Sequence, residues 1–216
     1  MDTNTRLQKI AAFVRARQQE TYLKHPDRAG LDRNLVDFDY RWRHTLRVAQ
    51  WGKIIAEAEG ADVELVAAAC LLHDVASFDV MPDDRDHGRA GAEIARPLLE
   101  ELGYTPEQVE AICYAVAAHA DVENPETLEA RVVTDADNMD RFGAYRVLYM
   151  CLPDIGDYDK LTEKLRKRIE RLESYRSKSP LCTLTGQKLF AEQLDFQIAF
   201  FKKIIEEHDA SVLPTL

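Results

Sequence analysis

The stretch Ala67-Ala68-Ala69-Cys70-Leu71-Leu72-His73-Asp74 is an apolar helical run that ends in a histidine followed by a carboxylate. So many consecutive apolar residues are typical of a helix that is buried on every side. A buried, ionised aspartate is costly unless a positive group pairs with it. Adjacent His and Asp at a helix end can both reach one divalent cation, so the pair is a candidate metal site. The alternative is an ordinary helix C-terminus, in which His73 bonds a last carbonyl and Asp74 caps the next turn.

Length and composition describe an ordinary folded protein and limit its partners. The chain has 216 residues, of which 46% are hydrophobic and 31% charged, so it can bury one substantial core. Its formal net charge of -10 argues against a general nucleic-acid or anionic-membrane surface, because both need a positive field. No apolar run reaches the length that spans a bilayer, and the first residues lack an apolar signal core. We therefore expect a cytoplasmic protein without a membrane partner.

The cysteines lie far apart and form no Cys-x-x-Cys pair: Cys70, Cys113, Cys151 and Cys182. This pattern favours free, reduced thiols over a disulfide framework or a zinc ribbon.

Helical spacing of apolar residues dominates the chain, and no period-two pattern lasts more than a few residues, so we expect an all-α fold. We expect a single domain over residues 1–216, with a core at about 34–150 and C-terminal helices at about 157–208 packed on it. The many large apolar residues of the last helix fit either core packing or a homodimer interface. A second His-Asp pair, His208-Asp209, has charged neighbours near the end of the sequence, and we expect it to lie on the surface.

A second histidine on a helix strengthens the metal interpretation. His44 shares a helix face with Val48, Trp51 and Ile55, at successive offsets of four, three and four residues. A lone histidine on an apolar face is usually a core residue. However, two histidines on the inner faces of consecutive helices can converge in space, and His44 precedes the helix that ends at His73.

One aspartate of an acidic cluster is placed inward by its helical spacing. Asp137 follows Ala130 by seven residues and Val133 by four, on the same side of the helix. Its neighbours Asp135 and Asp140 point elsewhere around the helix. They are expected to support the site, to cap a turn, or to face solvent.

Two further histidines lie at helix ends. His87 is expected at the start of a helix in which Pro97 predicts a kink or break. His119 ends the apolar stripe of Ile112 and Val116 on the following helix, so a histidine again stands where an apolar face stops.

The order of His44, His73-Asp74 and Asp137 resembles the HD-domain superfamily of metal-dependent phosphohydrolases, in particular a bacterial HD hydrolase branch. The resemblance covers roughly residues 5 to 205. It implies an HD-domain helical bundle with a metal site in its core. The blocks that carry it are Arg43-His44-Thr45-Leu46-Arg47-Val48, Ala68 to Asp74, Asp86-His87 with Gly91-Ala92-Glu93-Ile94-Ala95, and Asp135 to Ala144.

The resemblance implies that His44, His73, Asp74 and Asp137 bind one divalent metal. The family's last ligand lies in an Ala-Asp-x-hydrophobic context, which favours Asp137 over Asp135. A mixed nitrogen and oxygen ligand set leaves the metal open among Mn, Fe, Co, Ni, Mg and Zn.

Some HD proteins hold a second metal with additional histidines, and His87 and His119 stand where such ligands would fall. The alternative for these two residues is contact with a substrate phosphate or proton transfer. A metal lowers the pKa of bound water and polarises a phosphoryl oxygen. We therefore expect three catalytic residues: Asp74, which would also orient the attacking water, and His87 and His119, which would assist.

The expected substrate is a small phosphate ester or anhydride, with nucleotides as the leading class. Arginines near the motifs would supply a local positive field, and Arg47, Arg89 and Arg141 are the main candidates. Arg43 and Arg85 are also close in sequence. For each of them the alternative is an ordinary surface salt bridge.

Two departures put a nucleotidase mechanism in doubt. Ser77 stands where some HD nucleotidases carry a catalytic glutamate, and Asn138 stands where close relatives usually have a basic residue. Two other classes therefore stay open. A six-ligand HD site also fits a di-iron oxygenase, and a metal-binding or nucleotide-binding regulator without turnover is the third alternative.

Overall fold

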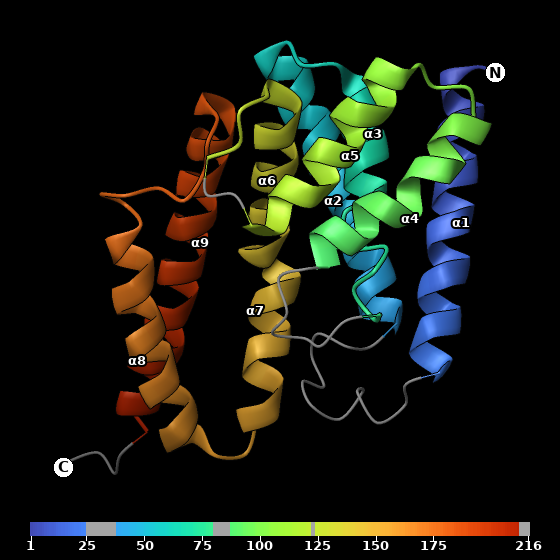
Figure 1. The fold of residues 1–216 in the computed structure, drawn as a ribbon. Coiled ribbons are helices and arrows are strands. Elements are labelled where there is room, and N and C mark those ends of the chain that lie inside the picture. Colours follow the sequence, from blue (N-terminus) through green and yellow to red (C-terminus); the bar gives the residue numbers. More distant parts are fainter. Residues whose placement is uncertain (25–37, 80–86, 122–123, 212–216) are drawn as a thin grey trace, which may run out of the picture.

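The computed structural model describes residues 1–24, 38–79, 87–121 and 124–211. Every regular element within these residues is a helix, which confirms the all-α expectation (Figure 1). The helices are α1 (Thr3–Lys24), α2 (Phe38–Glu59), α3 (Val63–Leu72), α4 (His87–Glu101), α5 (Pro106–Asp121), α6 (Leu128–Arg141), α7 (Ala144–Cys151), the 3-10 helix η2 (Leu152–Asp154), α8 (Tyr158–Ser174) and α9 (Leu184–Asp209). The predicted start of the core near residue 34, Arg85 and Asp86 lie outside the described residues.

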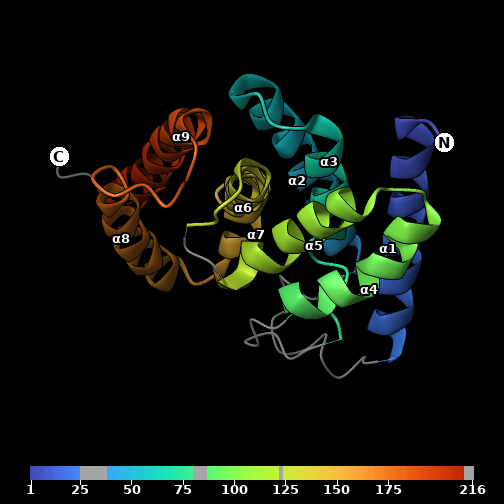
Figure 2. The ribbon, with the colours of Figure 1, turned by 45° about the horizontal axis from the view of Figure 1, so that its top comes forward.

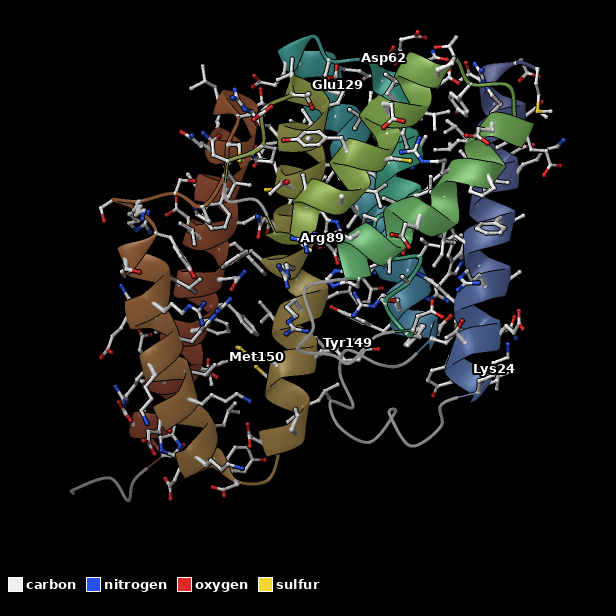
Figure 3. All side chains as sticks on the ribbon, in the orientation of Figure 1. Lys24, Asp62, Arg89, Glu129, Tyr149 and Met150 are labelled. Carbon is white, nitrogen blue, oxygen red and sulfur yellow. The ribbon has the colours of Figure 1, made fainter. Side chains whose placement is uncertain are left out.

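Helix α3, the apolar run of the sequence, lies at the centre of the bundle. It packs against α1, α2, α5 and α6, which explains why it is apolar all round. Ala68, Ala69, Cys70 and Leu72 are completely buried. Asp62 caps the first turn, because its carboxylate accepts hydrogen bonds from two backbone N–H groups of that turn. At the same end of the bundle the Asp62 backbone N–H donates to Glu129 Oε1 (Figure 3).

The remaining helices form two groups on either side of this centre. Helix α4 packs on α5, and α1 lies against α3. On the opposite side α9 packs on α6 and α2, and α8 packs on α9, so the C-terminal helices cover the face away from α1 (Figure 2). None of the helices in the described parts of the chain is long and apolar enough to cross a membrane.

Local signals explain where several helices begin. Thr105 and Gln108 form a capping box at the start of α5, since each side chain bonds the backbone N–H of the other residue. Pro97 does not break α4, which continues to Glu101. Its ring lies on the exposed side of the helix, where the carbonyl that loses its partner can be hydrated.

Asp135 holds the start of α9 and is not solvated. Its buried carboxylate accepts hydrogen bonds from the Cys182 backbone N–H at 2.7 Å, the Thr183 backbone N–H at 2.8 Å and Thr183 Oγ1 at 2.7 Å. A carboxylate on α6 therefore fixes the chain that enters α9. All four cysteines are free, as expected.

Helix α1 contributes both to the core and to the His-Asp turn. Ile10 and Val14 are completely buried. Gln18 is also buried, and its Nε2 donates a hydrogen bond to the Asp74 backbone oxygen at 3.0 Å. The turn that carries His73 and Asp74 is therefore supported from α1.

The second His-Asp pair and two large aromatic residues of α9 lie on the surface. His208 Nε2 is 3.2 Å from Asp159 Oδ1, and Asp209 forms an ion pair with Arg166, so this His-Asp pair makes ordinary surface contacts. On α9, Phe196 and Phe200 are 48% and 44% exposed, and their rings stack. The homodimer stays a prediction.

Candidate metal centre

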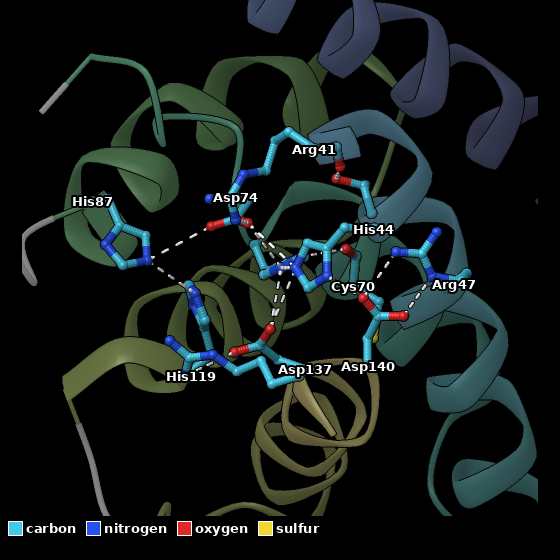
Figure 4. A network of polar contacts seen from close by, with 12 residues as sticks. Arg41, His44, Arg47, Cys70, Asp74, His87, His119, Asp137 and Asp140 are labelled. Carbon is cyan, nitrogen blue, oxygen red and sulfur yellow. Dashed lines mark hydrogen bonds and ion pairs between the residues drawn. The ribbon is translucent and has the colours of Figure 1, made fainter. Parts of the chain in front are cut away.

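Three helices bring the four expected ligands together around one point. His44 comes from α2, His73 and Asp74 follow α3, and Asp137 comes from α6 (Figure 4). His44 Nε2 lies 3.2 Å from His73 Nε2. Asp137 Oδ1 is 3.3 Å from His44 Nε2, and Asp74 Oδ2 is 3.4 Å from it. All four residues are buried, so they form a closed polar cluster within the apolar core.

The outer hydrogen bonds of three histidines fix their tautomers. His73 Nδ1 is 2.7 Å from the Cys70 carbonyl oxygen, and His119 Nδ1 is 2.6 Å from the Val116 carbonyl oxygen. His44 Nδ1 lies 2.7 Å from a carboxylate oxygen of Asp140. Carbonyl and carboxylate oxygens only accept, so each Nδ1 carries the hydrogen, and in a neutral ring each Nε2 keeps its lone pair.

These lone pairs explain why the cluster fits a divalent cation. Two Nε2 atoms face each other at 3.2 Å between the carboxylates of Asp74 and Asp137. Without a positive charge between them, the lone pairs and the carboxylates would repel one another in a buried site. Histidine ligands held through Nδ1–H by a carbonyl or carboxylate are the usual arrangement around protein-bound metals. His44, His73, Asp74 and Asp137 therefore fit such an ion.

A second group of ligand atoms adjoins the first. His87 Nε2 lies 3.2 Å from His119 Nε2 and 3.6 Å from Asp74 Oδ1. Asp74 Oδ2 faces His44 and His73, so its two oxygens face the two groups. His73 and His119 also meet edge to face, with ring centroids 5.0 Å apart. The arrangement suits two cations that share Asp74.

Close backbone packing brings His87 to His119. Gly88 follows His87 at the start of α4, and a Cβ there would lie 2.7 Å from the Ala117 carbonyl oxygen and 3.1 Å from that of Val116. Only glycine allows α4 to approach α5 this closely. The glycine after His87 is therefore part of the site's construction.

Burial and charge shift the pKa values of the site in opposite directions. Burial lowers the pKa of His119 to about 4, so this ring is neutral at pH 7. For His44 burial also opposes the charged form, but Asp137, Asp140 and Asp74 outweigh it and raise the pKa well above the usual value. In the metal-free protein, the carboxylates around His44 therefore attract a proton where they would otherwise attract a cation.

The pKa values of Asp74 and Asp137 are both lowered. Burial alone would raise them, but Arg41 and His73 lower the pKa of Asp74, and Arg141 and His44 lower that of Asp137. Both carboxylates are thus ionised near neutral pH, as metal ligands must be.

The arginines near the motifs have different surroundings. Arg47 forms two hydrogen bonds with Asp140, and Arg141 Nη1 lies 3.5 Å from Asp137 Oδ2. Arg43 is exposed and pairs with Asp39 one turn earlier in α2. Arg89 is exposed on α4.

Sequence reasoning missed Arg41, which forms an ion pair with Asp74 Oδ2. Its signal was available, because Arg41 precedes His44 by three residues and so lies on the same side of α2. Ser77 lies one turn beyond Asp74, where its backbone N–H donates to the Asp74 carbonyl. Its hydroxyl cannot replace the acid–base function of a glutamate at neutral pH. Asn138 is half-buried on α6 next to Asp137.

A sequence model described as HD domain matches residues 41–141. Among curated proteins, ribonuclease Y of Borreliella burgdorferi is 36% identical over 107 residues, which are 48% of this chain and 19% of that protein. Ribonuclease Y of Sulfurovum is 28% identical over 132 residues, 60% of this chain and 22% of that protein. The chain thus spans about a fifth of the length of these relatives.

Solved structures share the fold over nearly the whole chain. A predicted HD superfamily hydrolase from an uncultured Thermotogales bacterium has a TM-score of 0.62 and 24% identity, and the match covers 93% of this chain and 92% of that one. An HD-superfamily hydrolase from Bacillus thuringiensis has a TM-score of 0.67 and 17% identity, covering 97% and 100%. YpgQ of Bacillus subtilis in complex with ADP has a TM-score of 0.57 and 20% identity, covering 94% and 96%.

Proposed function

Because this chain is a member of the HD-domain superfamily, we propose that it is a metal-dependent phosphohydrolase for small phosphate esters or anhydrides, most of all nucleotides. One observation carries the proposal: buried imidazole lone pairs and carboxylates converge within 3.2 to 3.4 Å around His44 Nε2. A cation would stabilise such a cluster, and arginines lie directly beside its carboxylates.

The roles follow from the residues around that point. A divalent ion bound there supplies a water of lowered pKa and polarises a phosphoryl oxygen. Asp74 lies between the two histidine groups, so it can orient a water between them. His119, neutral at pH 7, can take or return a proton at Nε2, because its Nδ1–H is held by a carbonyl. His87, 24% exposed, stands on the solvent side of this group, where a phosphate would enter.

The substrate class rests on charge and size. The net charge of -10 disfavours long nucleic acids, whereas Arg41 and Arg141 give the site itself a local positive field. The likeness to YpgQ, whose structure contains ADP, supports a nucleotide. The ribonuclease Y matches favour a second candidate, a phosphodiester of RNA, because the protein from Borreliella burgdorferi is 36% identical over 107 residues.

The same ligand atoms would also suit a different reaction, the activation of oxygen by two irons, and an assay can distinguish it from hydrolysis. Two groups of ligand atoms that share Asp74 also suit a pair of irons that activates oxygen. Such a protein would consume oxygen and release no phosphate. The assay below therefore includes both readouts.

The test begins with metal-free protein, prepared with a chelator, to which Mn²⁺, Co²⁺, Ni²⁺, Mg²⁺, Zn²⁺ or Fe²⁺ is added. Release of phosphate or pyrophosphate is measured on nucleoside mono-, di- and triphosphates, and cleavage on a short RNA. We expect metal-dependent release from a nucleotide that is lost in Asp74→Asn. Oxygen consumption with two bound irons and no phosphate release would contradict the proposal.

The chain contains its own matched control. His208 and Asp209 form the second His-Asp pair, but they lie on the surface and contact Asp159 and Arg166. The double variant H208Q/D209N should keep the metal content and the activity of the unaltered protein. Loss of activity in this control as well would mean that the assay reports general damage to the fold.

A further inference from the structure

On two neighbouring helices, an expected metal ligand is followed one turn later by a charged residue that is not itself an expected ligand. Arg47 follows His44 by three residues on α2, and Asp140 follows Asp137 by three residues on α6. Helices α2 and α6 are packed against each other, and one turn separates each ligand from its follower. Arg47 and Asp140 therefore lie next to each other, beside His44 and Asp137 (Figure 4).

The contacts form a closed chain from arginine to ligand. Arg47 Nε is 2.5 Å from Asp140 Oδ1, and Arg47 Nη2 is 3.1 Å from Asp140 Oδ2. Asp140 Oδ2 also accepts the hydrogen bond from His44 Nδ1 at 2.7 Å. Asp140 is 3% exposed, so its carboxylate is almost completely removed from water.

Arg47 is held by the protein through two of its three guanidinium nitrogens, Nε and Nη2. The edge of its guanidinium faces Asp140, and the group lies 4.7 Å from the ring centroid of Tyr145 and 5.8 Å from that of Tyr40. Two parallel N–H donors on one carboxylate give a fixed geometry that a single charge does not. To bind a substrate phosphate, Arg47 would have to leave a buried carboxylate with no counter-charge, which is costly.

Charge explains why Asp140 needs an arginine. Arg41 pairs with Asp74 and Arg141 lies beside Asp137, whereas the buried carboxylate of Asp140 adds one more negative charge that neither of these arginines contacts. Arg47 balances that charge. Asp140 can then remain an acceptor for His44 Nδ1–H, which keeps His44 Nε2 directed at the metal point.

We propose that Arg47 and Asp140 are positioning residues that orient His44 as a metal ligand and set the metal affinity of the site, and that Arg47 does not bind substrate. The proposal reassigns Arg47 from the substrate-binding role expected for it above. It rests on the metal site of the proposed function.

The test measures metal binding directly, by calorimetric titration of metal-free protein with Mn²⁺. Asp140→Asn keeps the shape of the side chain but removes its charge, and we expect the affinity to fall about 10- to 100-fold. Arg47→Met should weaken binding in the same direction, and Arg47→Lys by less, since it keeps the charge but loses the paired donors. The double variant R47M/D140N should be little worse than D140N alone, because both changes break one chain of contacts.

Substrate kinetics at saturating metal separate positioning from substrate binding. There the KM of Arg47→Met for the nucleotide should lie within about twofold of the unaltered protein, and high metal should restore kcat. Wild-type metal affinity in both D140N and R47M, or a KM that rises in R47M at saturating metal, would overturn the proposal. If R47M does not fold, R47K carries the same comparison.

Two control variants test whether a change in metal affinity is specific to Arg47 and Asp140. Arg43→Met removes an arginine from the same helix whose partner, Asp39, is exposed. Asp154→Asn removes a buried, lysine-paired carboxylate of η2, which packs on α7 and α8. Both should bind Mn²⁺ with unchanged affinity. If the unaltered protein binds no metal, the proposed function fails, whereas unchanged binding in D140N and R47M overturns only the positioning roles.

Discussion

The two groups of ligand atoms differ in how they are built, although they share Asp74. In the first group, His44 and Asp137 lie on helices that pack tightly around α3, and both are buried. In the second, His87 is 24% exposed and stands at the first residue of α4. The core itself holds the first group in place, whereas the second depends on how closely one peripheral helix approaches α5. One part of a ligand set can thus be fixed by the core, while the other part depends on the packing of a peripheral helix.

The largest effect should come from removing a ligand of the core group. In Asp137→Ala the histidines lose the carboxylate that faces both Nε2 atoms, and we expect no tightly bound metal and a loss of activity of about a thousandfold or more. In His87→Ala one metal should remain bound. Elemental analysis of both variants gives the number of ions per chain, and equal metal loss in the two would break the distinction between the groups.

The pKa of His119 gives a sharper test in the metal-free protein. Its value is about 4 in the folded protein and 6.5 ordinarily. Between these values the unfolded chain binds more protons than the folded one, so the free energy of unfolding falls as the pH falls from 6.5 to 4. Between pH 7.5 and pH 5 the protein should lose about 2 kcal/mol more than His119→Gln does.

Urea unfolding at the two pH values checks this, with chelator present throughout. The raised pKa of His44 acts in the opposite direction, since it stabilises the fold in acid, but it is common to both proteins and cancels in their difference. His208→Gln on the surface serves as the control and should follow the unaltered protein. A His119→Gln variant with the same loss as the unaltered protein would show that His119 is charged in the fold.

The last prediction concerns Gly88. An added methyl group at this residue would meet the Ala117 and Val116 carbonyl oxygens and push α4 away from α5. Gly88→Ala should therefore cost about 1 to 3 kcal/mol of stability and lower kcat about tenfold, with one metal still bound. Glu93→Ala, on the exposed side of the same helix, is the control for α4. Normal kcat in Gly88→Ala would mean that the spacing of His87 and His119 does not matter.

The sequence was informative wherever one helix face decided the outcome. Spacing placed His44 and Asp137 on inward faces, and the structure brings them to the His73-Asp74 turn. The position of Asp140 on its own helix could not reveal its role, because that role depends on Arg47 of a different helix. A helical wheel describes one helix at a time, whereas this partnership requires knowledge of how α2 packs on α6.

Three other features depend on contacts between elements that the sequence of a single helix does not show. Asp135 has its partners beyond α8, so its support of the start of α9 had no local sign. Arg41 did have a local sign, its spacing from His44, but its contact is made with the turn after α3. The tolerance of α4 for Pro97 depends on which side of the helix faces solvent, and that also is set by packing.

The hydrogen bond from Gln18 to the Asp74 backbone carbonyl limits how the recognisable segment can be used as a module. The HD-domain match begins at residue 41, yet the turn that carries two of its ligands is supported by a side chain from well before that point. A fragment of residues 41–141 grafted into another protein would contain every ligand and lose the backbone support of Asp74. The segment that identifies the family is therefore shorter than the segment that must be transferred to keep the site intact.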